Sequence, residues 1–362
     1  MRNSWWKILG VALVFYGLIA GMLVPLKPNL SGSSPFSAEL GQPVTVDVTG
    51  YNTRFTEGEN RAWLRLPNPA RAEQIEKGEE VTAPDWVIPA TRVEVVDDRR
   101  AKITYALPAA LPTAGEAAAA SILMSSPANG SFTHPAALSL RNPTGAPNEA
   151  AWTTAEITAL DQFPGMTFPY RSVLDETIRN TYFHVSLWLA MMLIFIGGVV
   201  QAVRYLRTGR VEHDRKSLAL TSIGLFYGVL GLLTGMIWAQ YTWGSPWSFD
   251  VKQNMTAVAL LIYAAYFILR GSFEDDEKRA RIASAYNIFA FVALIPLIYV
   301  VPRLSESLHP GAGGNPALGG EDLDNTMRMI FYPIIIGWTL FGVWLATLQY
   351  RWMRVRGWLL DR

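Results

Sequence analysis

The stretch LALTSIGLFYGVLGLLTGMIWAQY (Leu218–Tyr241) carries no charged residue and exceeds the roughly 20 residues that a helix needs to cross a bilayer. TWGSPWSFD (Thr242–Asp250) follows at once and brings aromatic rings, a Gly, a Pro and one carboxylate together before the next apolar run. The other apolar runs are Ile8–Leu26, His184–Val203, Met255–Leu269, Ser284–Val301 and Ile330–Leu348. The sequence therefore predicts a mainly α, polytopic membrane protein with about six transmembrane helices.

Basic residues predict how these spans are oriented, because short cytoplasmic loops are enriched in Lys and Arg. Arg2 and Lys7 precede the first run, and three later segments share the enrichment: RYLRTGRVEHDRK (Arg204–Lys216), RGSFEDDEKRAR (Arg270–Arg281) and YRWMRVRGW (Tyr350–Trp358). We therefore expect both termini on the cytoplasmic side of the membrane. In a second interpretation the first run is a cleaved signal peptide, which would leave the other spans unchanged.

A segment of different composition separates the first two apolar runs. Between Lys27 and Phe168 the chain is rich in Pro, Gly, Ser, Ala and Thr, with alternating stretches such as PVTVDVTG (Pro43–Gly50) and AKITYAL (Ala101–Leu107) that are typical of strands. This predicts a β-sandwich-like insertion, which the charge rule puts outside the cytoplasm, and three regions result: residues 1–30 with the first helix, 31–168 with the insertion, and 169–362 with the other helices and the aromatic loop 241–254. His134 is expected in a surface loop of the insertion.

Composition excludes several kinds of chemistry. The chain has 362 residues, a formal net charge of +1 and no Cys, which removes disulfides, thiolate metal sites and Cys nucleophiles and gives no electrostatic reason to bind nucleic acid. It shows no hydrolase triad and no Gly-rich phosphate loop. The function must therefore depend on other groups.

The positions of the four histidines indicate which of them could bind a ligand. His213 lies in a basic cytoplasmic segment and is expected to be solvated. His184 opens the second span and His309 follows the fifth, so both are predicted at the outer face of the membrane, level with the aromatic loop. Isolated Trp residues at span ends usually form only an interfacial belt. A belt, however, does not require Gly244 and Pro246 to shape a turn between the rings, so we interpret the loop as a platform for a flat ligand.

Two histidines beside such a platform favour a metal macrocycle, because neutral imidazole is the usual axial donor to haem iron. His184 and His309 are therefore the predicted metal ligands. Arg179 and Lys252 are expected near them, where cations could pair with porphyrin carboxylates. Asp250 could either hold a turn of the loop or orient a cation.

These residues resemble a known family. TWGSPWSFDVK is similar to the tryptophan-rich signature WGxxWxWD of the haem-handling superfamily of cytochrome c maturation (CcmC, CcmF and CcsA), and the pattern from Asp175 to Gly311 most resembles the CcmC type. RNTYFHV corresponds to that type's Arg and first His, GSPWSFD to its haem-contacting loop, FEDDEKRAR to its cytoplasmic loop, and SESLHPG to its second His. Phe249 and Pro246 depart from the signature, which commonly has aromatic residues at these positions.

The resemblance implies a platform for haem b in cytochrome c biogenesis, located in the bacterial inner membrane with the insertion and the haem site on the periplasmic side. Haem would be bound by His184 and His309 and contacted by Trp243, Gly244, Trp247, Phe249 and Asp250, then transferred to a periplasmic haem chaperone of the CcmE type. It also implies a small CcmD-type membrane protein and a CcmA/CcmB-type ABC transporter as partners. The chain would at most promote haem attachment to the chaperone, as a haem lyase component without a catalytic residue of its own.

Two alternatives remain open at this stage. One is a cytochrome c synthetase of the CcsA or CcmF kind, which attaches haem to apocytochrome but carries further His pairs within its spans. The other is a membrane-anchored interaction protein without haem, in which the insertion binds a partner and the aromatic loop is only an anchor.

Overall fold

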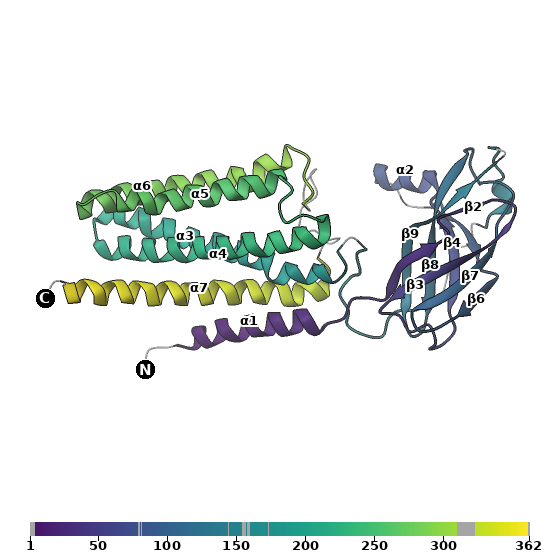
Figure 1. The fold of residues 1–362 in the computed structure, drawn as a ribbon, viewed down its shortest axis with the longest axis horizontal. Helices are drawn as coiled ribbons and strands as arrows, with labels where there is room; N and C mark the ends of the chain where they lie inside the picture. The colour runs from purple at the N-terminus through teal and green to yellow at the C-terminus, as the bar shows by residue number, and fades with distance from the viewer. Residues whose placement is uncertain are drawn as a thin grey trace. The chain divides into compact units, whose positions relative to one another are not determined.

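The computed structural model describes residues 4–78, 80, 82–143, 145–153, 157, 160–172, 174–309 and 323–360. The chain divides into two compact units (Figure 1). One unit comprises Met1–Val24 with Val173–Arg362 and is helical, whereas the other comprises Pro25–Ser172 and is built mainly of strands.

The helical unit confirms the expectation of six long apolar helices. Within the described part of the chain, six helices are long and apolar enough to cross a membrane. They contain α1 (Trp5–Leu23), α3 (His184–Thr208), α4 (Val211–Trp243), α5 (Val251–Gly271), α6 (Asp276–Ile295) and α7 (Asn325–Leu360). A 3₁₀ segment (Asp175–Tyr182) leads into α3, while a π segment (Pro296–Val300) and a 3₁₀ turn (Val301–Arg303) extend α6.

The connection between α3 and α4 is shorter than the sequence suggested. Only Gly209 and Arg210 separate the two helices, and Gly209 ends α3 in the left-handed conformation with φ 66°. His213 was expected in a solvated loop, but it lies in the first turn of α4, with Nδ1 2.8 Å from Oε1 of Gln201. The charged sequence is compatible with helix because its side chains extend beyond the apolar part of each helix.

Charged residues buried between the helices are paired. Asp214 near the start of α4 accepts hydrogen bonds from both terminal nitrogens of Arg270 at the end of α5, at 2.7 and 2.5 Å. Both side chains are largely buried, so each charge needs the other. This pair joins α4 and α5 at the end of the unit opposite to their connecting loop.

The second unit is a two-sheet sandwich, as the alternating stretches predicted. One sheet has the order β1-β3-β7-β6 and the other β2-β9-β8-β4-β5, the strand order of immunoglobulin-type domains. Apolar residues of both sheets form one core, with Val46, Ile103, Leu64, Ile122 and Leu138 almost fully buried. The strands are β1 (Asn29–Ser34), β2 (Ser37–Glu39), β3 (Pro43–Tyr51), β4 (Arg61–Leu66), β5 (Trp86–Pro89), β6 (Arg92–Val95), β7 (Arg100–Ala106), β8 (Ala117–Ser126) and β9 (Gly130–Arg141), with the short helix α2 (Pro69–Lys77).

His134 lies in β9 and not in a loop, which corrects the expectation from the sequence. It is paired with Ile122 of β8, next to an irregularity in the register of the two strands. Pro135 follows it and obscures the strand pattern in the sequence. Partial burial lowers the pKa of the His134 imidazole.

Candidate functional site

His184, the first residue of α3, has its ring held by α4. Its Nδ1 atom lies 2.8 Å from the carbonyl oxygen of Gly231 and 3.3 Å from Oγ1 of Thr234. A carbonyl oxygen can only accept a hydrogen bond, so Nδ1 carries the proton. The lone pair of the neutral ring is therefore on Nε2, which is the atom available to a metal.

A row of glycines in α4 makes room for the side chains of α3. A Cβ atom added at Gly224, Gly228, Gly231 or Gly235 would lie within 3.0 Å of the side chains of Phe195, Met191, Trp188 and His184, respectively. These four α3 residues succeed one another along one face of the helix. Small residues let two apolar helices approach closely in a membrane. The glycine spacing of four, three and four was visible in the sequence, but the sequence analysis did not use it.

Two Trp residues that the sequence analysis did not select flank the His184 ring. The centroid of the Trp238 ring lies 5.8 Å from that of His184, and the Trp188 centroid lies 6.3 Å away, both edge to face. Trp238 is itself fixed, because its Nε1 donates to Oγ1 of Thr177 at 3.0 Å. The imidazole therefore stands in an aromatic surrounding with its Nδ1 side closed by α4.

The aromatic loop between α4 and α5 is held in one shape. Gly244 ends α4 with φ 78°, a conformation that glycine adopts without strain. Gln253 in the first turn of α5 closes the loop from the other side, because its Oε1 accepts from the Ser248 amide at 3.0 Å and its Nε2 donates to the Pro246 carbonyl at 3.3 Å. The sequence-based expectation of a fixed turn around Pro246 agrees with this geometry.

Asp250 connects the loop to the segment that carries His309. Its side chain is only 2% exposed. Oδ1 accepts from the Lys252 amide at 2.9 Å and thereby caps α5, while Oδ2 accepts from the Leu308 amide at 2.8 Å and from Oγ of Ser307 at 2.9 Å. Burial alone would raise the pKa of this carboxyl, but these hydrogen bonds hold it below its usual value. Asp250 is therefore a buried carboxylate with several donors directed at it.

His309 is oriented by the same carboxylate. Its Nδ1 lies 2.8 Å from Oδ1 of Asp250, and its ring meets the Trp243 ring edge to face, with centroids 4.8 Å apart. Burial lowers the pKa of His309, although Asp250 opposes the shift, so the ring is neutral near pH 7. Because Nδ1 donates to the carboxylate, Nε2 is again the nitrogen with the free lone pair. This is the carboxylate–histidine arrangement that commonly supports metal ligands.

The other residues selected from the sequence have different surroundings. Nη1 of Arg179 donates to the carbonyls of Gly21 and Val24, both at 2.7 Å, so it binds the end of α1. Lys252 has no carboxylate within ion-pair distance of its Nζ among the residues that the structure describes. Trp247 is half-buried in the loop. Phe249 is 78% exposed and has φ 56°, which is unusual for a bulky side chain.

These features define a class of protein: a six-helix unit of membrane-spanning length with two neutral histidines and an aromatic loop at one end. His184 begins α3 and Trp243 ends α4, while Asp250 caps α5 and binds His309 (Figure 1 shows the helices). No group of three or more His, Cys, Asp or Glu suited to a bare metal ion occurs in the described ranges. Each of the two imidazoles is oriented through Nδ1, which leaves Nε2 as the nitrogen with the lone pair.

Comparison with known proteins shows what this part of the chain resembles. Residues 159–309 match the family described as cytochrome C assembly protein. The chain is 28% identical over 171 residues to heme exporter protein C of Bradyrhizobium diazoefficiens, which covers 46% of this chain and 63% of that protein. It is 25% identical over 185 residues to heme exporter protein C of Escherichia coli K12, covering 51% and 71%, and 24% identical over 176 residues to that of Haemophilus influenzae, covering 49% and 71%. The resemblance to the CcmC type of cytochrome c maturation protein is thus confirmed.

Proposed function

We propose that this protein binds haem between His184 and His309 at the outer face of the inner membrane and presents it to a periplasmic haem chaperone of the CcmE type. The observation that carries the proposal is the matched state of the two histidines. Each donates from Nδ1 to a fixed acceptor, the Gly231 carbonyl or the Asp250 carboxylate, and each keeps Nε2 free. The heme exporter names of the relatives support haem as the cargo.

The surroundings fit a haem that is held without covalent attachment. The chain has no Cys to form thioether bonds with haem vinyl groups, which favours haem b. Trp243, Gly244, Trp247 and Phe249 would supply the platform of the aromatic loop. We propose that Lys252 pairs with a haem carboxylate. Arg179, whose guanidinium binds the end of α1, would instead position the segment that leads into His184.

The distribution of basic residues supports a periplasmic site. The α3–α4 and α5–α6 connections and the end of α7 carry the clusters of Arg and Lys that are typical of cytoplasmic loops. His184, the aromatic loop and His309 lie at the other ends of these helices. We therefore propose a multi-pass inner membrane protein whose strand unit and haem site are outside the cytoplasm. The name of the relatives further suggests an ABC-type haem exporter, with CcmA/CcmB-type and CcmD-type subunits, as its assembly.

Haem delivery fits better than cytochrome c synthesis. The sequence has four histidines, and the two outside the proposed site are separated from each other. His134 lies in the strand unit and His213 is paired with Gln201 in the helical unit, so no second His pair exists for another haem. The covalent bond to haem would then be made on the chaperone, and we assign no catalytic residue to this chain.

Co-expression with a tagged CcmE-type chaperone tests the proposed transfer. We expect a haem-stained chaperone band that survives denaturing electrophoresis when the full chain is present, and none when His184 and His309 are both replaced by Ala. A c-type apocytochrome that acquires haem from this chain without any chaperone would instead support a synthetase. Both functions, delivery and synthesis, require bound haem, so this experiment tests the transfer and not the haem site.

Gly235→Ala should weaken haem retention, because its new Cβ would lie 2.6 Å from Cε1 of His184 and force the ring to move. Displacing the partner of a metal ligand typically costs about 10- to 100-fold in affinity, so we expect a loss in this range. Gly197→Ala in α3 is the matched control, since its Cβ would make only an ordinary contact of 3.5 Å with Leu220. Haem per purified protein measures both. Equal retention in the two variants would show that the His184 position is not critical.

A further inference from the structure

The strand unit has one sheet edge that the described chain leaves open. Of the four edge strands, β5 is covered by a bridge in which the Val87 amide donates to the Thr153 carbonyl at 2.9 Å. β1 and β2 are consecutive strands in different sheets, so the chain crosses from one sheet to the other at these two edges. Oγ of Ser33 in β1 donates to the Ala137 carbonyl of β9 at 2.8 Å and links them. β6 pairs only with β7 among the described strands. An open edge with free backbone groups can pair with another strand.

The backbone groups on the free side of β6 belong to Val93 and Val95. The Val96 amide donates to the Arg100 carbonyl of β7 at 2.9 Å, and in the same register Glu94 is opposite Lys102 and Arg92 is opposite Thr104. Alternate residues of an antiparallel strand bond to the same neighbour. The amides and carbonyls of Val93 and Val95 therefore point away from β7.

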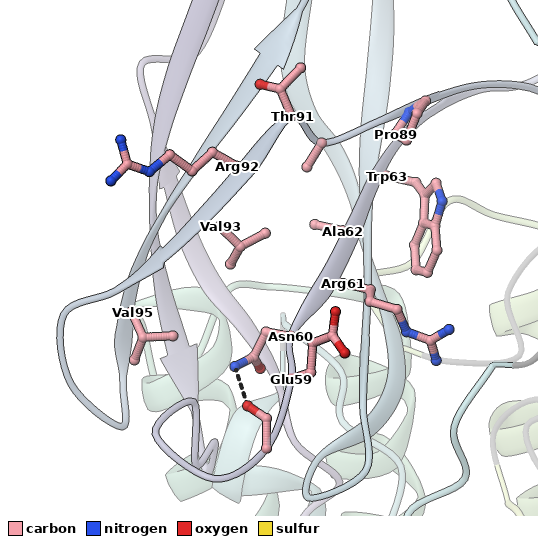
Figure 2. Close-up of a pocket in the computed structure, with 12 residues that line it drawn as sticks. Glu59, Asn60, Arg61, Ala62, Trp63, Pro89, Thr91, Arg92, Val93 and Val95 are labelled. Atoms are coloured by element: carbon pink, nitrogen blue, oxygen red, sulfur yellow. Dashed lines mark hydrogen bonds between the residues drawn. The ribbon is translucent and has the colours of Figure 1, made fainter.

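A hollow of about 500 Å³ lies beside this edge. It is bounded by β6 and by the beginning of β4, and Figure 2 shows Val93 and Ala62 pointing into the space between the two strands while Arg92 points away. Val95 and the following Val96 are 40% and 52% exposed. The edge thus combines unpaired backbone, space beside it and exposed apolar side chains.

The charges of β6 pair within the strand, with Arg92 Nε 2.8 Å from Glu94 Oε1, and their order also makes this edge complementary to itself. In a symmetric antiparallel pair centred on Val93, Arg92 of each chain is opposite Glu94 of the other, and the two Val93 residues share hydrogen bonds through their outward backbone groups. Centring the pair on Arg92 or Glu94 would place like charges opposite each other, which is unfavourable. Of these three registers, only the one centred on Val93 satisfies both charge and backbone, and the order Arg92-Val93-Glu94 lets a second copy of the same strand form it.

We infer that β6 is an interface at which two copies of this chain pair edge to edge, joining their β1-β3-β7-β6 sheets across a two-fold axis. The contact is short and therefore weak by itself. Confinement of both copies to one membrane would favour it by raising their effective concentration. The inference is independent of haem binding, so it stands or fails apart from the function proposed above.

The absence of native Cys allows a direct test in the full-length protein. With Val93→Cys, mild oxidation of native membranes should give a disulfide-linked dimer as the main product, because facing residues of a strand pair lie at a separation that a disulfide can span. Thr45→Cys, exposed on β3 of the same sheet, is the control and should remain mostly monomeric. Equal dimer yields from the two variants would overturn the inference. Linkage of Val93→Cys to a different protein would overturn it too.

Charge exchange gives a second test that does not depend on Cys. Arg92→Glu and Glu94→Arg should each reduce the dimer fraction of the otherwise unchanged chain in lipid nanodiscs at least several-fold, measured by native mass spectrometry. Combining the two changes restores opposite charges across the pair and should restore the dimer. A dimer fraction that is unaffected by the single changes, or not recovered in the double variant, would contradict the proposed register.

Discussion

Replacing both His184 and His309 with Ala should remove bound haem while leaving the helical unit intact. Their Nε2 atoms are the free nitrogens of two oriented, neutral imidazoles, and the chain has no Cys to replace them. Even loss of a residue that supports a metal ligand typically lowers affinity by about 10- to 100-fold, so we expect loss of both ligands to exceed this range. The Soret absorbance per purified protein is the measurement.

His213→Ala is the control for this experiment. The His213 ring contacts Gln201 near the α3–α4 connection and lies at the other end of α4 from the aromatic loop. Its removal should leave the haem spectrum unchanged. If the double variant is stably inserted, as shown by the same elution and helical content as the wild type, and still has the wild-type Soret band, His184 and His309 are not the ligands.

The helices could be predicted because long apolar runs have few other solutions in a membrane. The helix ends could not be predicted, because each helix continues beyond the apolar part of its sequence. α4 begins at Val211 and includes Asp214, whose charge is tolerated because it pairs with Arg270 of α5. That partner is 56 positions away, and no local pattern indicates it.

In the candidate site too, the residues could be predicted from the sequence but their contacts could not. The small number of histidines and the predicted topology were enough to select His184, His309 and Asp250. The roles proposed for them depend on contacts between residues far apart in the sequence. Asp250 and His309 are 59 positions apart, so the sequence left open whether Asp250 caps a turn or orients a cation. The structure shows that it caps α5 and also binds a ring nitrogen. Trp188 and Trp238 were missed because an aromatic residue within an apolar helix usually indicates only packing or lipid contact.

For Arg179 the role predicted from the sequence differs from the contacts in the structure. Its position five residues before His184 suggested a partner for a haem carboxylate. The last carbonyls of a helix lack partners within that helix, however, and Nη1 of Arg179 supplies donors to Gly21 and Val24 at the end of α1. The side chain thereby ties the segment before α3 to α1, which makes it a positioning residue in our proposal.

Asp250→Asn should reduce haem retention by about 10- to 100-fold, the usual cost of losing the partner of a metal-binding His. The two oxygens of Asp250 accept from Lys252, Ser307, Leu308 and His309, and an amide keeps only one acceptor oxygen. If its oxygen faces Ser307 and Leu308, its NH2 group faces His309. The imidazole must then accept at Nδ1 and carry its proton on Nε2, which removes the lone pair needed by the metal.

Ser307→Ala separates this effect from a general loosening of the loop. It removes the hydrogen bond from Ser307 Oγ to Asp250 and the acceptor of the His309 amide at 3.2 Å, each worth about 1 kcal/mol of folding free energy, but leaves the bond between Oδ1 and the His309 ring in place. We expect a modest fall in thermal stability with haem retention near the wild-type level. Asp250→Asn should lower both the thermal stability and the haem retention. The midpoint for haem loss in a competition with apomyoglobin compares haem retention in the two variants. If the two variants lose haem equally, Asp250 acts only by holding the loop, and the orientation of His309 does not depend on its carboxylate.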